Sequence, residues 1–232
     1  MQRIGILCAC DSELAPFLPH LTERETKRRG MLTFHTGLIC GVPVAALYCG
    51  VCKVNAAIAA QMLIDGYDIA AIVKSGTAGG VDPAVGLFDT IVSTQSAYHD
   101  VDEGILTSYH PRLSSIWFDA DARLLGAARR AAEGKPQVRF GRTATGEKFI
   151  EDSRRDEIRA RLSPLSVDME TAAIAHVCFA NGVPFLAVRS ITDNAAHEGL
   201  GAFEQNCARA SACSAAFVLD LLRTLELTAF AK

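Results

Sequence analysis

The stretch Ser166–Asp193, SVDMETAAIAHVCFANGVPFLAVRSITD, holds the pattern that decides the fold. Its two apolar runs are short and lack period-two alternation, which predicts strands that are covered on both faces. A helix is expected between them over 171–180. Asn181 and Gly182 supply the helix stop, and Pro184 can stand at the first position of the second strand. We therefore predict a βαβ unit with parallel strands joined by a crossover helix.

Three charged residues follow these two predicted strands. Glu170 comes after the first strand, and Arg189 and Asp193 come after the second. In open α/β sheets, ligands bind beyond the carboxyl ends of the strands. The stretch is therefore predicted to contribute two carboxylates and one guanidinium to a binding site.

The composition indicates a globular domain without a polyanionic partner. Half of the 232 residues are hydrophobic, so the chain can bury a large core, and we expect 1–232 to form a single domain. The net charge is −3, and the arginines within 154–161 alternate with acidic residues, which is typical of a solvated helix face rather than a nucleic-acid patch. The opening apolar run is too short for a signal peptide and no stretch approaches transmembrane length, so a cytoplasmic location without membrane contact is expected.

Two features could suggest a metal site. Cys49 and Cys52 have metal-like spacing, but no second pair accompanies them, so buried reduced thiols are expected for the eight cysteines. The run Tyr98–Asp102 holds a histidine and two aspartates, but successive side chains of an extended segment point to opposite faces. We expect a hydrogen-bonded His–Asp pair there, and no metal.

The rest of the chain alternates strand and helix patterns, which predicts the α/β class. Strands are expected over 3–8, 31–39, 42–49, 69–75, 90–97 and 138–145, and helices over 14–18, 53–64, 121–133, 149–162 and 202–227. The run Gly76–Gly80 is expected to form a tight turn whose amides could approach a ligand. It matches neither the GxGxxG fingerprint nor a Walker loop.

Several separated motifs together resemble the purine nucleoside phosphorylase/nucleosidase superfamily, and most closely its 5′-methylthioadenosine/S-adenosylhomocysteine nucleosidases. The matching motifs are IGILCACDSEL, CGVCKVNAA, SGTAGGVDPAVGLFDTIVS, AYHDVD, TGEKFI, SVDMETAAIAHVC and VPFLAVRSITDNA, followed by Phe203. They occur in the family's order and cover most of the chain. The resemblance implies a single-domain three-layer α/β/α fold with a central twisted mixed sheet, no cofactor, and usually a homodimer with active sites near the subunit interface.

The resemblance also implies roles for individual residues. Glu13 falls at the position of the water-activating base, Asp193 at that of the acid facing the purine, and Glu170 at that of the carboxylate gripping the ribose hydroxyls. Met169 and Arg189 line the sugar in such enzymes. The remaining positions match the nucleophile pocket (Thr77, Ala78, Gly79), the base contacts (Phe149, Ile150) and two further walls (Val51, Phe203).

Cleavage of an N-ribosidic bond explains these residue types. A purine leaves readily only when its N7 is protonated, so the site needs a carboxylic acid that holds a proton near neutrality, for which Asp193 is the candidate. Glu13 would take a proton from water on the other face of the sugar. Inverting glycosidases separate such carboxyl groups by roughly 6.5–9.5 Å, and we expect a similar separation here.

Alternatives to a nucleosidase differ in what the site must contain. A phosphorylase needs cationic groups for a dianion, whereas Asp11 and Glu13 would repel phosphate and Arg189 is the only basic residue that the sequence places in the pocket. Hydrolysis is therefore favoured over phosphorolysis. A nucleoside-binding module could dispense with Glu13 and Asp193, and a dinucleotide-dependent oxidoreductase would need a GxGxxG run, which is absent.

Departures from the family's pattern leave the substrate's 5′ group open. Asp168 stands where glutamate is usual, and Lys148 where a small residue is common. The segment Glu103–Trp117 is short, with Ile105 and Leu106 where an aromatic residue helps to form the 5′ pocket. Methylthioadenosine, S-adenosylhomocysteine, 5′-deoxyadenosine and a futalosine-type nucleoside all remain candidates, as does a 6-oxopurine.

Overall fold

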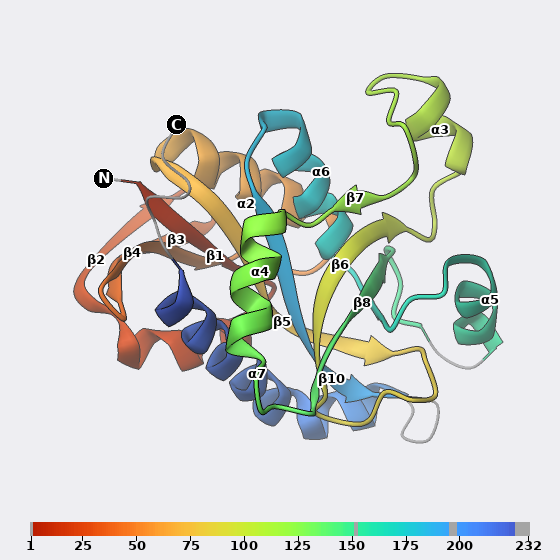
Figure 1. The fold of residues 1–232 in the computed structure, drawn as a ribbon. Coiled ribbons are helices and arrows are strands. Elements are labelled where there is room, and N and C mark those ends of the chain that lie inside the picture. The colour runs from red at the N-terminus through yellow and green to blue at the C-terminus, as the bar shows by residue number, and fades with distance from the viewer. Residues whose placement is uncertain (1, 151–152, 195–198, 226–232) are drawn as a thin grey trace.

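The computed structural model describes residues 2–150, 153–194 and 199–225, which fold around one large sheet (Figure 1). Its strands are β1 (Arg3–Cys8), β2 (Thr22–Arg29), β3 (Leu32–Ile39), β4 (Val42–Tyr48), β5 (Ile69–Gly80), β6 (Thr90–Tyr98), β7 (Phe118–Asp119), β8 (Val138–Thr145), β9 (Ser166–Asp168) and β10 (Phe185–Asp193). Its helices are α1 (Asp11–Leu14), the 3₁₀ helix η1 (Ala15–His20), α2 (Lys53–Gly66), α3 (Glu103–Ser108), α4 (Ala122–Ala131), α5 (Ser153–Leu162), α6 (Thr171–Asn181) and α7 (Gly199–Thr224).

The sheet is mixed and closes partly on itself. The strand order is β10-β6-β8-β9-β5-β1-β4-β3-β2, and β10 also pairs with β5. Strands β10, β6, β8, β9 and β5 therefore form a closed ring, from which β1, β4, β3 and β2 extend as an open wing. The predicted central twisted mixed sheet is confirmed, and the hairpin of β3 and β4 is antiparallel as expected.

Helices cover both faces of the sheet, as the three-layer expectation requires (Figure 1). Successive side chains of a strand point to opposite faces, so each strand in the middle of the sheet contributes to two cores. Ile4 and Ile6 of β1 pack in the core beneath α4 and α7, whereas Leu7 packs in the core beneath α2 and α6. This burial on both faces explains the continuous apolar runs of the central strands.

The predicted βαβ unit is wrong. β10 runs parallel to β5, whereas β9 runs antiparallel to it, so α6 joins two strands of opposite direction that are not neighbours. β9 is only three residues long and meets β5 at Gly79 and Gly80. Gly79 is also the register partner of Asp193. The charged side chains of this stretch therefore lie near the carboxyl end of β5. They do so although β9 and β10 do not form the parallel pair that the apolar runs predicted.

The predicted glycine turn at Gly76–Gly80 is also wrong, because β5 continues through it to Gly80. Gly76 has a φ of +152°, and a Cβ atom on it would lie 2.3 Å from the Glu13 carboxyl group. A side chain at this position would therefore collide with that carboxylate. The glycine is needed for the close approach of Glu13 to the strand, not for a reversal of the chain.

Other differences concern segments with weak sequence patterns. β2 and α3 were not predicted, and all eight residues of β2 are exposed, so no apolar periodicity marks that strand. The helix expected over 149–162 begins at Ser153, with 151–152 outside the described residues. The helix expected over 202–227 begins at Gly199, and positions beyond 225 lie outside the description.

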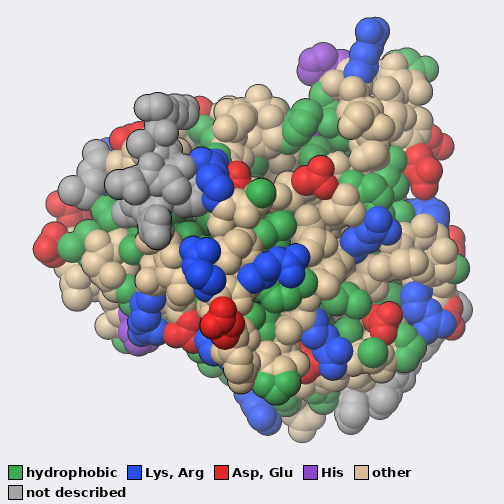
Figure 2. Space-filling view, viewed as in Figure 1, with side chains coloured by type: hydrophobic (Ala, Val, Ile, Leu, Met, Phe, Trp, Pro, Cys, Tyr) green, Lys and Arg blue, Asp and Glu red, His purple; other side chains and the backbone are tan. Residues whose placement is uncertain are grey.

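The expected burial of the thiols is confirmed for only three of the eight cysteines. All eight cysteines lie within the described residues and are free, although only Cys8, Cys49 and Cys178 are buried. Figure 2 shows Lys and Arg side chains interspersed with Asp and Glu on the visible face, without one continuous basic patch. Among the helices that the structure describes, none is long and apolar enough to cross a membrane.

Candidate functional site

A cavity of about 280 Å³ lies at the carboxyl ends of β5 and β10. Every residue that the sequence analysis proposed for the site lines it. They are Glu13, Val51, Thr77, Ala78, Gly79, Phe149, Ile150, Met169, Glu170, Arg189, Asp193 and Phe203. They come from seven separate parts of the chain, so the fold brings the motifs together at one place.

Glu13 is held against β5 as an ionised carboxylate. Its Oε1 accepts hydrogen bonds from the Thr77 amide and hydroxyl, at 2.7 and 2.9 Å. Its Oε2 accepts one from the Ala9 amide at 2.6 Å and one from Lys74 Nζ at 3.3 Å. Burial alone would raise the pKa of Glu13, but the charges of Lys74 and Arg189 and the two backbone amides outweigh it and lower the pKa to about 2.

Arg189 joins three carboxylates into one cluster. Its Nε is 3.1 Å from Asp168 Oδ2, its Nη2 is 3.3 Å from Glu170 Oε2, and its Nη1 is 4.0 Å from Glu13 Oε1. Together with Lys74, these residues form what we call the charged cluster: Glu13, Lys74, Asp168, Glu170 and Arg189. Three carboxylates face two cations within it, and all five side chains are buried.

Lys74 is the member of this cluster that the sequence analysis missed. The expectation that Arg189 is the only basic residue at the pocket is wrong, because Lys148 also lines the cavity and Lys74 binds Glu13 from behind it. A lysine directly after the apolar run IAAIV could have been noticed, because a lysine is almost never fully buried unless it is paired.

Asp168 and Glu170 have different surroundings. Asp168 Oδ1 accepts hydrogen bonds from the Thr145 hydroxyl at 2.7 Å and from the Thr171 amide at 3.1 Å, so it ties the start of α6 to β8. Glu170 Oε1 accepts one from the Cys52 amide at 3.0 Å. Burial raises the pKa of Glu170, and the neighbouring Asp168 and Glu13 carboxylates add to this rise against the opposing charges of Lys74 and Arg189.

Asp193 forms a second buried ion pair at the cavity, with Arg155 of α5. Arg155 Nη2 lies 2.5 Å from Asp193 Oδ2, and Nη1 donates to the Gly80 carbonyl oxygen at 2.5 Å. The other carboxylate oxygen, Oδ1, accepts a hydrogen bond from the Thr192 hydroxyl at 2.7 Å. The sequence analysis assigned the arginines of this helix to a solvated face, which is wrong for Arg155, because its side chain is 4% exposed.

Two aromatic rings form one wall of the cavity. Phe149 and Phe203 meet edge to face, with ring centroids 6.1 Å apart and an interplanar angle of 75°. Ile150 and Lys148 also line this wall. Such a wall offers an apolar, polarisable surface to a flat ligand.

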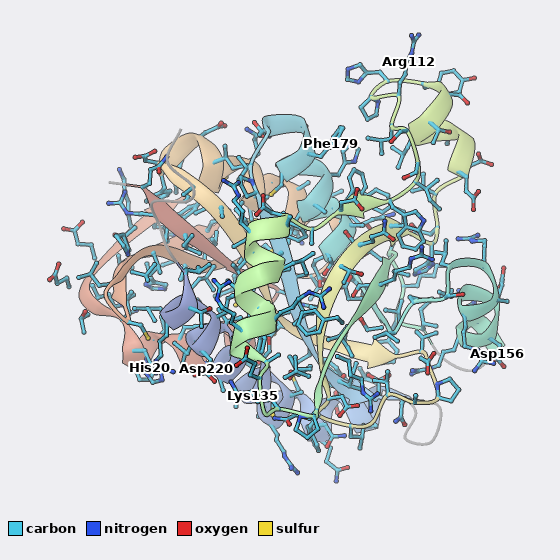
Figure 3. All side chains as sticks on the ribbon, viewed as in Figure 1. His20, Arg112, Lys135, Asp156, Phe179 and Asp220 are labelled. Atoms are coloured by element: carbon cyan, nitrogen blue, oxygen red, sulfur yellow. The ribbon has the colours of Figure 1, made fainter. Side chains whose placement is uncertain are left out.

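Some expected contacts are not found. None of the described residues 103–117 lines the cavity, and Arg112 marks the tip of this segment, which projects from the body of the molecule (Figure 3). The expected His99–Asp100 pair is also wrong, because the Asp100 carboxylate binds Lys53 Nζ at 2.9 Å and the Glu147 amide at 2.9 Å. The described part of the chain holds no group of three or more His, Cys, Asp or Glu residues that could bind a metal ion.

Comparisons with known proteins show the family and the fold of the chain. The family model described as "Phosphorylase superfamily" matches residues 3–223. The 5′-methylthioadenosine/S-adenosylhomocysteine nucleosidase of Maridesulfovibrio salexigens is 34% identical over 97% of this chain and 100% of its own length. The enzyme of that name from S. pneumoniae, solved with a transition-state inhibitor, superposes with a TM-score of 0.89 at 27% identity, covering 97% of this chain and 100% of that one. The futalosine hydrolase of Helicobacter pylori superposes with a TM-score of 0.88 at 27% identity, covering 97% and 98%.

Proposed function

We propose that the protein cleaves a 5′-substituted adenosine of the methylthioadenosine/S-adenosylhomocysteine type. The chain belongs to the phosphorylase superfamily and is a nucleosidase, that is, an N-glycosyl hydrolase. The products would be adenine and the free 5′-substituted ribose. The observation that carries this proposal is the pairing of two carboxylates, Glu13 and Asp193, in different surroundings of one cavity. Cleavage of an N-ribosidic bond needs one such group at the base and another at the sugar.

Asp193 is proposed as the acid that protonates the purine N7. Its Oδ2 is bound to Arg155 and its Oδ1 to Thr192. These two contacts hold the carboxyl group in a fixed position at the cavity. The aromatic wall of Phe149 and Phe203 would hold the purine ring beside this carboxyl group.

The charged cluster is proposed to bind the ribose and to activate water. Glu170 can accept hydrogen bonds from both hydroxyls of a cis-diol, and Arg189 orients it by an ion pair at 3.3 Å. Glu13 is ionised throughout the neutral range and can receive a proton from the water that attacks the sugar carbon. Because its pKa is about 2, it is a weak base, and the proton would leave the water only as the water bonds to the electron-poor carbon.

Water is favoured over phosphate by the charge balance of the cluster. Its two cations, Lys74 and Arg189, already face the three carboxylates Glu13, Asp168 and Glu170. A phosphate dianion would need uncompensated cations, which the cluster does not offer. A futalosine-type nucleoside is a second candidate substrate, because the H. pylori futalosine hydrolase superposes on the chain almost as well as the other nucleosidase does.

We also propose that the protein acts as a cytoplasmic homodimer. Large apolar side chains are exposed on neighbouring elements: Val54 and Ile58 on α2, Ile105 on α3, Tyr109 after it, and Phe179 at the end of α6. A second copy of the chain could cover them and would bring another segment 103–117 toward the cavity. Light scattering after gel filtration should give twice the chain mass of 24.8 kDa.

Product analysis tests the proposed activity. The protein is incubated with methylthioadenosine, S-adenosylhomocysteine, 5′-deoxyadenosine, futalosine and inosine, with and without phosphate, and free base is measured by chromatography. We expect adenine from the first two, at a rate that phosphate does not change. Release that requires phosphate would identify a phosphorylase, and no release from any compound would favour a nucleoside-binding module.

A further inference from the structure

Lys74 lies within β5 and is fully buried, with no exposed side-chain surface. Its Nζ donates to Glu13 Oε2 at 3.3 Å and to the Ser75 carbonyl oxygen at 3.1 Å. It does not line the cavity, so it reaches a ligand only through Glu13. A buried lysine is costly unless it is paired, so its presence behind a cavity carboxylate calls for an explanation.

The lysine is an ammonium ion in this position. Burial and the nearby Arg189 both act to lower the pKa of Lys74, but the carboxylates of Glu13 and Glu170 outweigh them and raise it. Without Lys74, three carboxylates would face a single guanidinium. One of those carboxyl groups would then bind a proton more readily.

A proton on Glu13 would end its proposed role. A neutral carboxyl group cannot take a proton from water, and both Glu13 oxygens are already occupied by donors from Ala9, Thr77 and Lys74. The backbone amides fix where the oxygens lie, while Lys74 brings a full positive charge from the rigid centre of the sheet. The backbone amides thus determine the position of the Glu13 carboxylate, and Lys74 supplies the positive charge beside it.

We propose that Lys74 is a positioning residue that keeps Glu13 ionised and so allows the hydrolysis to continue in acid solution. This inference rests on the proposed function of Glu13. According to this inference, Lys74 determines the lowest pH at which the protein is active, and it has little effect on substrate binding. The prediction is therefore a change in the pH profile, with little change in KM near neutrality.

Other titratable groups also face Glu13 from the surrounding elements. Besides Lys74 and Arg189, they are Glu170 and the thiols Cys8, Cys10, Cys49 and Cys207. Burial raises the pKa of Cys8, and it raises the pKa of Cys49 to about 12. The hydrogen bond to Cys207 raises the pKa of Cys10. These three thiols therefore stay neutral. The same hydrogen bond lowers the pKa of Cys207 to about 6. Every profile is therefore repeated with Cys207→Ser, which removes that titration.

The experiment compares pH profiles of kcat/KM, which report the ionisation of the free enzyme. Lys74→Met removes the charge but keeps an unbranched side chain. Its acid limb should move up by one pH unit or more, a loss of about tenfold per unit below the new limb, with KM at pH 8 unchanged within about threefold. Lys74→Arg keeps a charge and should restore most of the activity in acid. A merely structural role would lower kcat/KM equally at all pH values.

Lys135→Met is the matched control, because it removes the same charge far from the cluster. Lys135 is paired at 2.5 Å with Asp220 of α7, and the two labels lie next to each other in Figure 3. Its acid limb should coincide with that of the unchanged protein. An acid limb in Lys74→Met that also coincides with it would overturn the inference.

A second measurement covers the case in which Lys74→Met does not fold. Carbon-13 labelling of glutamate carboxyl groups, with the Glu13 signal assigned by Glu13→Gln, follows this group in the unchanged protein. It should remain ionised from pH 8 down to pH 4, and protonation with a midpoint above pH 5 would overturn the inference. If the unchanged protein releases no base from any nucleoside, the proposed function fails instead.

Discussion

Two carboxylates of the cavity, Glu13 and Asp193, form buried pairs with cations that come from different parts of the fold. Glu13 is paired with Lys74, which is anchored in the middle of β5, and Glu13 also accepts two backbone hydrogen bonds. Asp193 is paired with Arg155 of α5, a helix that packs outside the ring of strands. Neither carboxylate is more than 3% exposed, so burial does not distinguish them.

This difference matches the tasks proposed for the two residues. A group that receives a proton from water must stay ionised. Glu13 is held so by a lysine and an amide of β5, which cannot leave without breaking the sheet, and by the Ala9 amide just after β1. A group that gives a proton to a purine must alternate between two forms. Asp193 has one helix-borne partner and one hydroxyl, so its surroundings can change without disturbing the sheet.

The largest expected effect is the loss of either carboxylate. Glu13→Gln and Asp193→Asn keep the shape of the side chain but remove its charge and its proton chemistry. Each should lower kcat by about 10²–10⁴-fold while the protein stays folded. Steady-state kinetics with methylthioadenosine measure kcat, and circular dichroism shows whether the variant is folded. Full turnover by either variant would remove that residue from the mechanism.

The next largest loss in kcat is expected when the Glu13 side chain is kept but moved from its position. A Cβ atom at Gly76 would lie 2.3 Å from the Glu13 carboxyl group, so Gly76→Ala must push this carboxylate away from β5. We expect a loss in kcat of about 10²-fold. Gly134→Ala is the matched control, because Gly134 also has a positive φ, +74°, but nothing lies within 4 Å of its added Cβ. Equal losses in both variants would show that backbone strain, and not Glu13, is responsible.

A moderate effect is expected at the Asp193 pair. Arg155→Met removes the guanidinium that binds Asp193 Oδ2, so this carboxyl group should lose its fixed position at the cavity. We expect kcat to fall by about tenfold in steady-state kinetics with methylthioadenosine, with a smaller change in KM. Arg154→Met, at the exposed neighbouring position, should leave both constants unchanged. An unchanged kcat in Arg155→Met would mean that the arginine does not position the acid.

The smallest expected effect concerns stability in acid. The pKa of Glu13 is lowered on folding from an ordinary value of 4.5 to about 2. Because the folded value lies below the unfolded one, the stabilisation is fully present above pH 4.5 and is lost as the pH falls toward 2. The Tm of the unchanged protein should therefore fall more steeply over this range than that of Glu13→Gln. Parallel curves would mean that Glu13 titrates alike in both states.

Short-range patterns were enough to predict many elements of the fold. The β3–β4 hairpin followed from two apolar runs separated by Cys40 and Gly41, both of which adopt positive φ. Most of the site positions, from Glu13 to Phe203, were implied by the family resemblance of the motifs, and they all line one cavity.

What could not be predicted depends on pairing between distant segments. The direction of β9 is set by two register partners in β5, and nothing in its own three residues encodes it. β2 has no apolar face and exists because it pairs with β3. Two further buried cations, Lys74 and Arg155, acquire their partners only when the fold places a carboxylate beside each, although the lysine that follows an apolar run could have been noticed as unusual.

The most direct test of the account is the origin of the oxygen on the sugar product. Methylthioadenosine is cleaved in water enriched in oxygen-18, in the presence of phosphate, and the sugar is examined by mass spectrometry. The account predicts adenine and a methylthioribose that carries the label at its anomeric hydroxyl group. A methylthioribose 1-phosphate without the label would contradict it, because phosphate and not water would then be the nucleophile.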